Sequence, residues 1–126
     1  MTFLTILLSS LAVAASPPAI KYDDAHFGSI LTTPKMQALY YWRVEKRAGR
    51  KIRCTGSCAR VWPPLYAKGA VPMHVAGIRG TFGSIRRPDG RRQVTFNGLA
   101  AYTYAHEGPR QVLCDNVNGW FVVRLR

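Results

Sequence analysis

Acidic side chains are scarce in this chain of 126 residues, which has six Asp and Glu against eighteen Lys and Arg and a formal net charge of +12. So large an excess of one sign favours polyanionic partners and says little about the fold. No stretch is low in complexity or carries one charge for long enough to predict disorder. The length suits one domain with a modest core, so we expect a single basic globular domain.

Motifs of common enzymes are also missing. No G-x-S-x-G nucleophile motif occurs, and Gly77, Gly80 and Gly83 lack the Lys-Ser/Thr and the helix that a phosphate-binding loop requires. Cys114 and His106 are residue types of a nucleophile pair, but no third orienting group can be identified. We therefore expect a non-enzymatic protein without a cofactor.

The first fifteen residues, MTFLTILLSSLAVAA, contain no charged side chain. Their apolar stretch is shorter than the roughly 20 residues of a membrane-spanning helix, and Val13 and Ala15 fit the positions before a signal-peptidase site. We predict cleavage before Ser16, a polar segment over 16–25, and a secreted or periplasmic mature chain without a transmembrane span. No basic residue precedes the apolar stretch, so an uncleaved anchor or an N-terminal core strand is the alternative.

Turn signals dominate the rest of the chain. Pro-Asp-Gly at 88–90 and Asn-Gly at 97–98 each lie between segments that favour strands, and Asn-Gly suits a two-residue hairpin. No segment shows a sustained helical period, and the best helical candidate is one turn at 57–61. We predict an all-β or mainly β domain. The expected strands are 29–33, 38–45, one that begins near 85, 93–96, 99–104 and 120–125.

An aromatic and acidic pattern occurs twice. Tyrosine is followed two residues later by an aromatic residue and three residues after that by an acid, at Tyr40, Trp42 and Glu45 and again at Tyr102, Tyr104 and Glu107. A cysteine-containing loop and a tryptophan, Trp62 or Trp120, follow each copy. We predict two related hairpin units, about 28–65 and about 83–125, within one domain over 26–125. Two such units packed together would bury the aromatic residues between them.

Four motifs in order carry a resemblance to a known family: the aromatic and acidic pattern, CTGSCARVWPPL (54–65), RPDGRRQVTFNG (87–98) followed by YTY, and NGWFVV (118–123). Together they resemble bacterial secreted-repeat proteins described as predicted lipoproteins with a Yx(FWY)xxD motif, over about residues 26–125. The resemblance implies export, a paired repeat and an unknown biochemical role. Glu45 and Glu107 stand where the family usually has Asp, and no cysteine follows the leader for lipidation.

Two roles are open for the repeated pattern. Residues two apart on a strand share a face, so Tyr40 with Trp42, and Tyr102 with Tyr104, can pack as pairs in the core. The acid then falls beyond the strand, where it can accept bonds from backbone N–H groups or a tyrosine hydroxyl. The alternative makes Glu45 and Glu107 a paired site for a cation or for acid–base chemistry.

The cysteines also allow two interpretations. Cys54 and Cys58 are four positions apart, which is not the C-x-x-C spacing of zinc or redox motifs, so a local disulfide is expected in an oxidising compartment. Cys114 can pair with one of these two, cross-link a partner or stay buried. The alternative is a soft-metal site for copper or electron transfer. Its candidate ligands are Cys54, Cys58, Cys114, Met36, Met73, His26, His74 and His106.

Basic residues cluster in two places: KRAGRKIR at 46–53, and the turn sequence around 88–90, where Arg86, Arg87, Arg91 and Arg92 lie close together. Arginine guanidinium groups suit phosphate and carboxylate ligands, and a solvated turn is the simpler interpretation. Outside the cytoplasm the expected partners are anionic envelope polymers or lipid head groups. Export makes nucleic acid an unlikely ligand.

Overall fold

The computed structural model describes residues 2–7 and 16–126. Most of the predicted leader, residues 8–15, and with it the predicted cleavage position, lie outside the described residues. Residues 2–7 have no regular secondary structure, and their side chains are exposed. In the described ranges, no helix combines the length and the apolar character needed to span a membrane.

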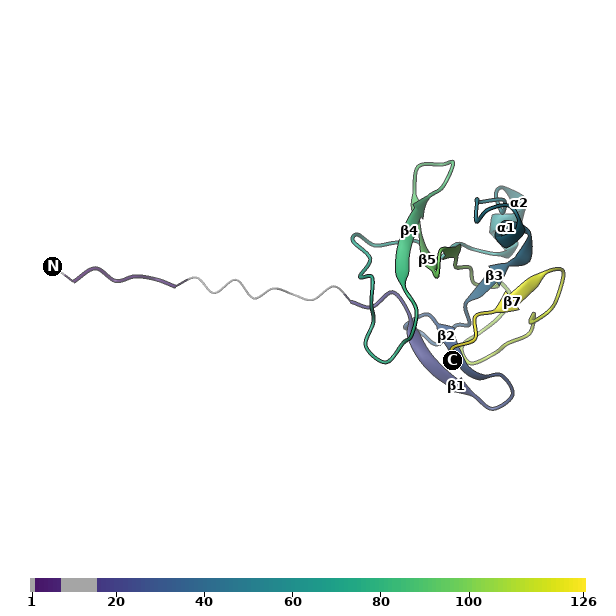
Figure 1. Ribbon diagram of the computed structural model, residues 1–126, viewed down its shortest axis with the longest axis horizontal. Coiled ribbons are helices and arrows are strands. Elements are labelled where there is room, and N and C mark those ends of the chain that lie inside the picture. The colour runs from purple at the N-terminus through teal and green to yellow at the C-terminus, as the bar shows by residue number, and fades with distance from the viewer. Residues whose placement is uncertain (1, 8–15) are drawn as a thin grey trace.

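The described chain is mainly β, as predicted, with short antiparallel strands and two five-residue helices (Figure 1). The helix over 57–61 agrees with the predicted helical turn. The strands of the described chain form sheets with the orders β1-β2, β3-β7 and β4-β5-β6. The elements are β1 (Ile20–Asp24), β2 (Gly28–Thr32), β3 (Tyr40–Trp42), α1 (Arg43–Arg47), α2 (Ser57–Val61), β4 (Phe82–Arg86), β5 (Arg92–Phe96), β6 (Leu99–Ala100) and β7 (Trp120–Val122).

Four elements differ from the prediction, the simplest case being the strand expected over 120–125, of which β7 covers Trp120–Val122. The strand expected over 38–45 ends at Trp42, and α1 follows at once, because one helical turn rotates Glu45 into the interior. The strand expected over 99–104 is regular only in β6, and Tyr102 beyond it bridges both Tyr40 and Pro64. The polar segment 16–25 contains β1, whose residues alternate between half-buried and exposed, which is the period of a strand with one face covered.

The two halves meet at a symmetric pair of main-chain bonds. Tyr40 N–H donates to the carbonyl of Tyr102 over 2.8 Å, and Tyr102 N–H donates back to the carbonyl of Tyr40 over 2.9 Å. These two residues are fully buried. Residues 62 positions apart in the chain are therefore joined at the centre of the domain.

Each hairpin is completed by a segment from the other half of the sequence. The segment after Trp120 joins the β1–β2 hairpin, where Leu31 N–H of β2 donates to the carbonyl of Val123 over 2.9 Å. The segment after Trp62 joins the β4–β5 hairpin, where Val94 N–H of β5 donates to the carbonyl of Leu65 over 2.8 Å. The ends of the two predicted units are thus exchanged. That the halves arose from one repeated unit stays a prediction.

Aromatic rings fill the space between the halves. Trp62 and Trp120 stack with ring centroids 4.0 Å apart, and each has a second ring on its outer side. Trp42 lies 5.1 Å from Trp120, and Tyr104 lies 4.9 Å from Trp62. The rings of Tyr40 and Tyr102 meet this stack edge-on, at 5.2 Å from Trp62 and 5.1 Å from Trp120. Stacked and edge-on arrangements are both favourable, so this six-ring stack is the main part of one core cluster.

Candidate functional site

The first acid of the repeated pattern, Glu45, lies in the interior. Its Oε2 accepts bonds from Arg53 N–H over 2.7 Å, from Cys54 N–H over 3.1 Å and from the Tyr102 hydroxyl over 2.6 Å. Two of these donors lie in the loop that follows α1, and the third belongs to the other half of the chain. We call this arrangement the first clasp. It fixes the 48–56 loop and joins the two halves.

The second acid, Glu107, makes the matching contacts. Its Oε2 accepts a bond from Leu113 N–H over 2.9 Å and one from the Tyr40 hydroxyl over 2.7 Å. Cys114 N–H lies 3.4 Å from the same hydroxyl. We call this arrangement the second clasp. The first tyrosine of each copy, Tyr40 or Tyr102, is therefore bound by the acid of the opposite copy.

Both clasps are buried, and this shapes their ionisation. Burial, with the adjoining carboxylates, raises the pKa of the Tyr40 and Tyr102 hydroxyls well above the usual tyrosine range. Burial also raises the pKa of the Glu107 carboxyl, against the opposing bonds from Leu113 and Tyr40. The Oε1 atoms of Glu45 and Glu107 are buried without a hydrogen-bond partner. The contacts are those of structural anchors rather than of an open acid–base site.

The cysteine prediction is confirmed in its simpler form. Cys54 and Cys58 form a disulfide, with Cα atoms 5.2 Å apart. Cys114 is a buried free thiol. Burial, followed by the charge of Glu107, raises the pKa of this thiol, so little of the reactive thiolate forms.

The soft-metal alternative loses two of its candidate ligands to the disulfide. Nowhere in the described part of the chain do three His, Cys, Asp or Glu side chains come together in a possible metal site. The sulfur of Met36 already has a partner, because its Sδ accepts a bond from Arg110 Nε over 3.3 Å. His26, His74 and His106 are exposed in three separate loops.

The four arginines at the β4–β5 turn do not act alike. Arg87 was predicted to belong to the polyanion site, and this is wrong because its side chain is buried. It donates to Gln93 Oε1 over 2.6 Å and to the carbonyl of Cys54 over 2.7 Å. A guanidinium satisfies buried acceptors well because its donors form a rigid planar fork. Arg87 therefore holds the disulfide loop against the sheet.

The other three arginines of this turn are exposed. Arg91 lies with its guanidinium carbon 3.8 Å from the centre of the Tyr66 ring and pairs with Asp89 over 3.3 Å. Arg86 and Arg92 are directly opposite in the β4–β5 register. Their guanidinium groups diverge, because Arg92 Nε donates to Ser84 Oγ over 2.9 Å whereas Arg86 Nη2 lies near Gly90 in the turn.

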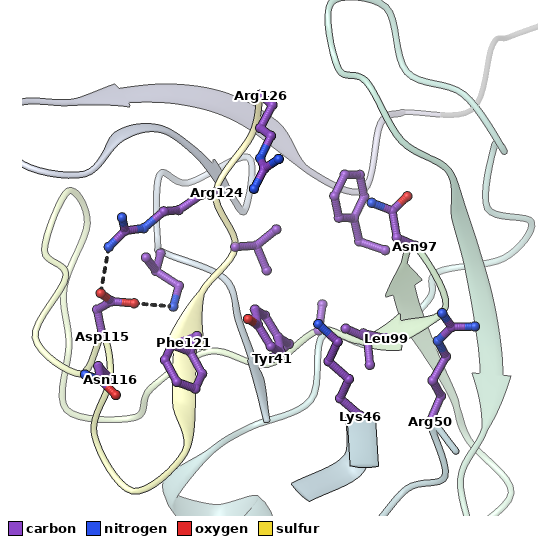
Figure 2. Close-up of a pocket in the computed structure, with 14 residues that line it drawn as sticks. Tyr41, Lys46, Arg50, Asn97, Leu99, Asp115, Asn116, Phe121, Arg124 and Arg126 are labelled. Atoms are coloured by element: carbon purple, nitrogen blue, oxygen red, sulfur yellow. Dashed lines mark hydrogen bonds and ion pairs between the residues drawn. The ribbon is translucent and has the colours of Figure 1, made fainter. Parts of the chain in front are cut away.

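A larger cationic site lies on the far side of β3 and β7 from the aromatic core. Tyr41 and Phe121 are opposite one another in the strand register, and their rings stack with centroids 5.6 Å apart. They lie in the lining of an open cleft of about 720 Å³, within the range of small-molecule sites (Figure 2). We call it the basic cleft.

Four cations line the basic cleft and come from two separate segments: Lys46 and Arg50 from α1 and the loop after it, and Arg124 and Arg126 from the C-terminal segment. Among the described residues that line the cleft, the acidic side chain is Asp115, which pairs with Arg124 over 2.8 Å and accepts a bond from Val122 N–H over 3.1 Å. The site therefore keeps a surplus of positive charge.

Neutral polar groups complete the lining. Asn97 and Asn116 are exposed at the cleft, and each has a side-chain amide that can both donate and accept hydrogen bonds (Figure 2). Arg50 is held in place against the β5–β6 turn, where a Cβ on Gly98 would lie 3.0 Å from Arg50 Cδ. Gly98 has φ of +80°, which also favours glycine at this turn.

Sequence reasoning found half of this site. Lys46 and Arg50 belong to the predicted basic cluster at 46–53, whereas Tyr41, Phe121 and the C-terminal arginines were not singled out. The available signal was strand alternation: with Tyr40 and Trp42 in the core, Tyr41 must face the other way. Its neighbour across the sheet, however, depends on the pairing of β3 with β7, which joins residues about 80 positions apart.

No protein-family model matches this chain, and comparisons with curated proteins and with solved structures give no match either. The resemblance to secreted-repeat proteins therefore stays a prediction.

Proposed function

We propose that this protein is an exported, non-enzymatic binding protein that holds an acidic polysaccharide of the cell envelope in the basic cleft. The observation that carries the proposal is the concentration of Lys46, Arg50, Arg124 and Arg126 around one concave surface whose single carboxylate is already paired. Such a surface attracts a ligand that supplies several negative charges.

The charge of the whole surface supports the same class of ligand. All eighteen Lys and Arg lie in the described residues, and seventeen of them are exposed. Two of the six acids, Glu45 and Glu107, are buried in the clasps. The ion pairs within the described ranges are Arg91 with Asp89 and Arg124 with Asp115. Most cations are thus free to meet an external anion.

The aromatic pair favours a polysaccharide over a nucleic acid. Single-stranded nucleic acid is usually held by bases that stack on open aromatic faces. Here the two rings face each other, while the Arg43 guanidinium carbon lies 5.4 Å from the Phe121 ring centre and Lys46 Nζ lies 5.8 Å from the Tyr41 ring centre. The rings therefore position cations, and the amides of Asn97 and Asn116 suit sugar hydroxyls.

Two observations support a binding role outside the cytoplasm. The Cys54–Cys58 disulfide is typical of proteins from oxidising compartments, which agrees with the predicted leader. The groups best suited to acid–base chemistry, Glu45 and Glu107, are bound inside the domain and do not line the cleft. The family resemblance implies export as well.

Calorimetry on the mature chain at low salt tests the proposal. We expect polygalacturonate and heparin to bind and neutral dextran not to bind. The double variant Lys46→Gln/Arg126→Gln should weaken binding roughly tenfold, since each exposed charge pair contributes up to about 1 kcal/mol. The matched control Lys35→Gln/Arg60→Gln removes two exposed charges outside the cleft and should change affinity much less.

Two further probes make the outcome decisive. Vesicles with anionic lipid and a single-stranded DNA oligomer carry the same sign of charge on other chemistry. Preferential binding of either one over both polysaccharides would overturn the proposal. Equal losses in the cleft variant and in the control would also overturn it, because binding would then depend on net charge alone.

A further inference from the structure

The basic cleft is not isolated from the arginines of the β4–β5 turn. Arg50 lines the cleft, and the next residue, Lys51, lines a second surface hollow together with Ile52, Ile85 and Arg86. Arg50 packs over the β5–β6 turn at Gly98, whereas the carbonyl of Cys54 is bound by Arg87 at the other end of β4 and β5. The 50–54 loop therefore crosses the β4–β5–β6 sheet from the cleft to the arginine turn.

Cations outnumber acids along this path, and the exposed acid in the turn at its end, Asp89, is paired with Arg91 over 3.3 Å. The segment over 46–53 contains five Lys and Arg and no acid. The side chains of Lys51 and Arg86 are exposed and make no ion pair in the described structure. Arg86 marks the end of the path, where its Nη2 lies 3.8 Å from the position of a Cβ on Gly90 in the turn.

We propose that the cleft, Lys51 and Arg86 form one continuous cationic track, so that the bound acidic polysaccharide extends from the basic cleft along the 50–54 loop to the β4–β5 turn. This inference rests on the proposed function and adds the direction and the length of the ligand. Short ligands occupy the cleft alone, whereas longer chains gain the contacts to Lys51 and Arg86. Affinity therefore rises with chain length until the track is filled.

A length series of uronate oligosaccharides tests the track. We expect the dodecasaccharide to bind at least tenfold more tightly than the tetrasaccharide, which corresponds to roughly two added charge contacts. Lys51→Gln/Arg86→Gln should remove most of this gain and leave tetrasaccharide binding unchanged. Lys46→Gln/Arg126→Gln should weaken every length, and Lys35→Gln/Arg60→Gln serves as the matched control.

Salt dependence gives an independent measurement. Each cation that meets an anionic group releases counterions, so the slope of log affinity against log salt should fall by about one per removed contact. Lys51→Gln/Arg86→Gln should reduce the slope for the dodecasaccharide and not for the tetrasaccharide.

The failures of the two proposals are distinguishable. If the affinities of the two oligosaccharides are equal, or if Lys51→Gln/Arg86→Gln weakens both alike, the track is wrong while the cleft stands. If no uronate oligosaccharide binds at low salt, the proposed function itself fails.

Discussion

The two clasps have the same plan and different surroundings. Glu45 accepts three bonds beside a disulfide, and the buried Arg87 lies close enough to the Tyr102 hydroxyl to oppose the rise of its pKa. Glu107 accepts two bonds beside the free thiol of Cys114. Burial raises the pKa of Glu107, and the groups that oppose this rise are the Leu113 N–H and the Tyr40 hydroxyl rather than a cation.

This difference shows that a repeated motif fixes geometry without fixing energetics. In both clasps a carboxylate bonds to a tyrosine from the other half of the chain. The first clasp gives its carboxylate a third donor, which compensates for its burial. The second lacks that compensation, so keeping its carboxylate ionised costs more. We expect the first clasp to contribute more to stability at neutral pH.

Removal of the acids should have the largest effect. Glu45→Ala leaves three donors of the first clasp without their acceptor, so we expect a loss of about 3–5 kcal/mol in the free energy of unfolding. Glu107→Ala should cost about 1–3 kcal/mol, since two donors lose their partner and no buried cation is exposed. Urea denaturation at neutral pH measures both. Equal losses would show that the two surroundings do not matter.

The pH dependence of stability should separate the clasps next. The raised pKa of Glu107 means that the folded protein keeps this proton at pH values where the unfolded chain has lost it. The free energy of unfolding should therefore fall as pH rises above the ordinary Glu range, by at most about 1.4 kcal/mol per pH unit. The measurement is the difference between the wild type and Glu107→Gln over this interval. A difference that is constant, or that grows in favour of the wild type, contradicts the assignment.

Loss of the disulfide should have the smallest effect and should be local. The loop it closes is short, so Cys54→Ser/Cys58→Ser should cost about 2 kcal/mol or less. Amide hydrogen exchange should accelerate at Arg53, which donates to Glu45, and not at Leu113, which donates to Glu107. The matched control is Cys114→Ser. Equal acceleration at both amides would mean that the clasps open together.

The two segments that complete the hairpins, one after Trp62 and one after Trp120, also have similar pairing and different surroundings. The segment after Trp120 carries Arg124 and Arg126 into the open basic cleft. The corresponding segment after Trp62 carries Leu65 to Lys68 along a hollow of about 420 Å³, whose lining includes Pro17, Pro18, Pro34 and Pro72. Similar backbone pairing thus gives a cationic surface on one side and a largely apolar one on the other.

Local patterns were enough to predict much of the fold. The Asn-Gly turn between β5 and β6, the helical turn of α2 and the Cys54–Cys58 bridge all depend on residues within a few positions of one another. Long-range pairings were not readable in the same way. The partner of β3 is β7, and neither strand carries a mark that specifies the other. The basic cleft could not be predicted for that reason.

Arg87 illustrates the same limit for a single residue. In the sequence it is one of four arginines at a turn, with nothing to separate it from Arg86 or Arg92. In the folded protein it is buried, because Gln93 and the carbonyl of Cys54 both need a donor at that place. Its role depends on two acceptors, of which the Cys54 carbonyl lies 33 positions away in the chain.

The sequence by itself determined the mainly β character, the turns, the short disulfide and the excess of positive charge, since each follows from composition or from neighbouring residues. Only the tertiary structure decided which acid meets which tyrosine and which cations surround a common cleft. Those contacts join residues 57 to 67 positions apart in the clasps and about 80 apart in the cleft. Such distances are closed by the packing of the aromatic core, whose rings the repeated pattern marks but whose pairing across the two halves depends on long-range contacts.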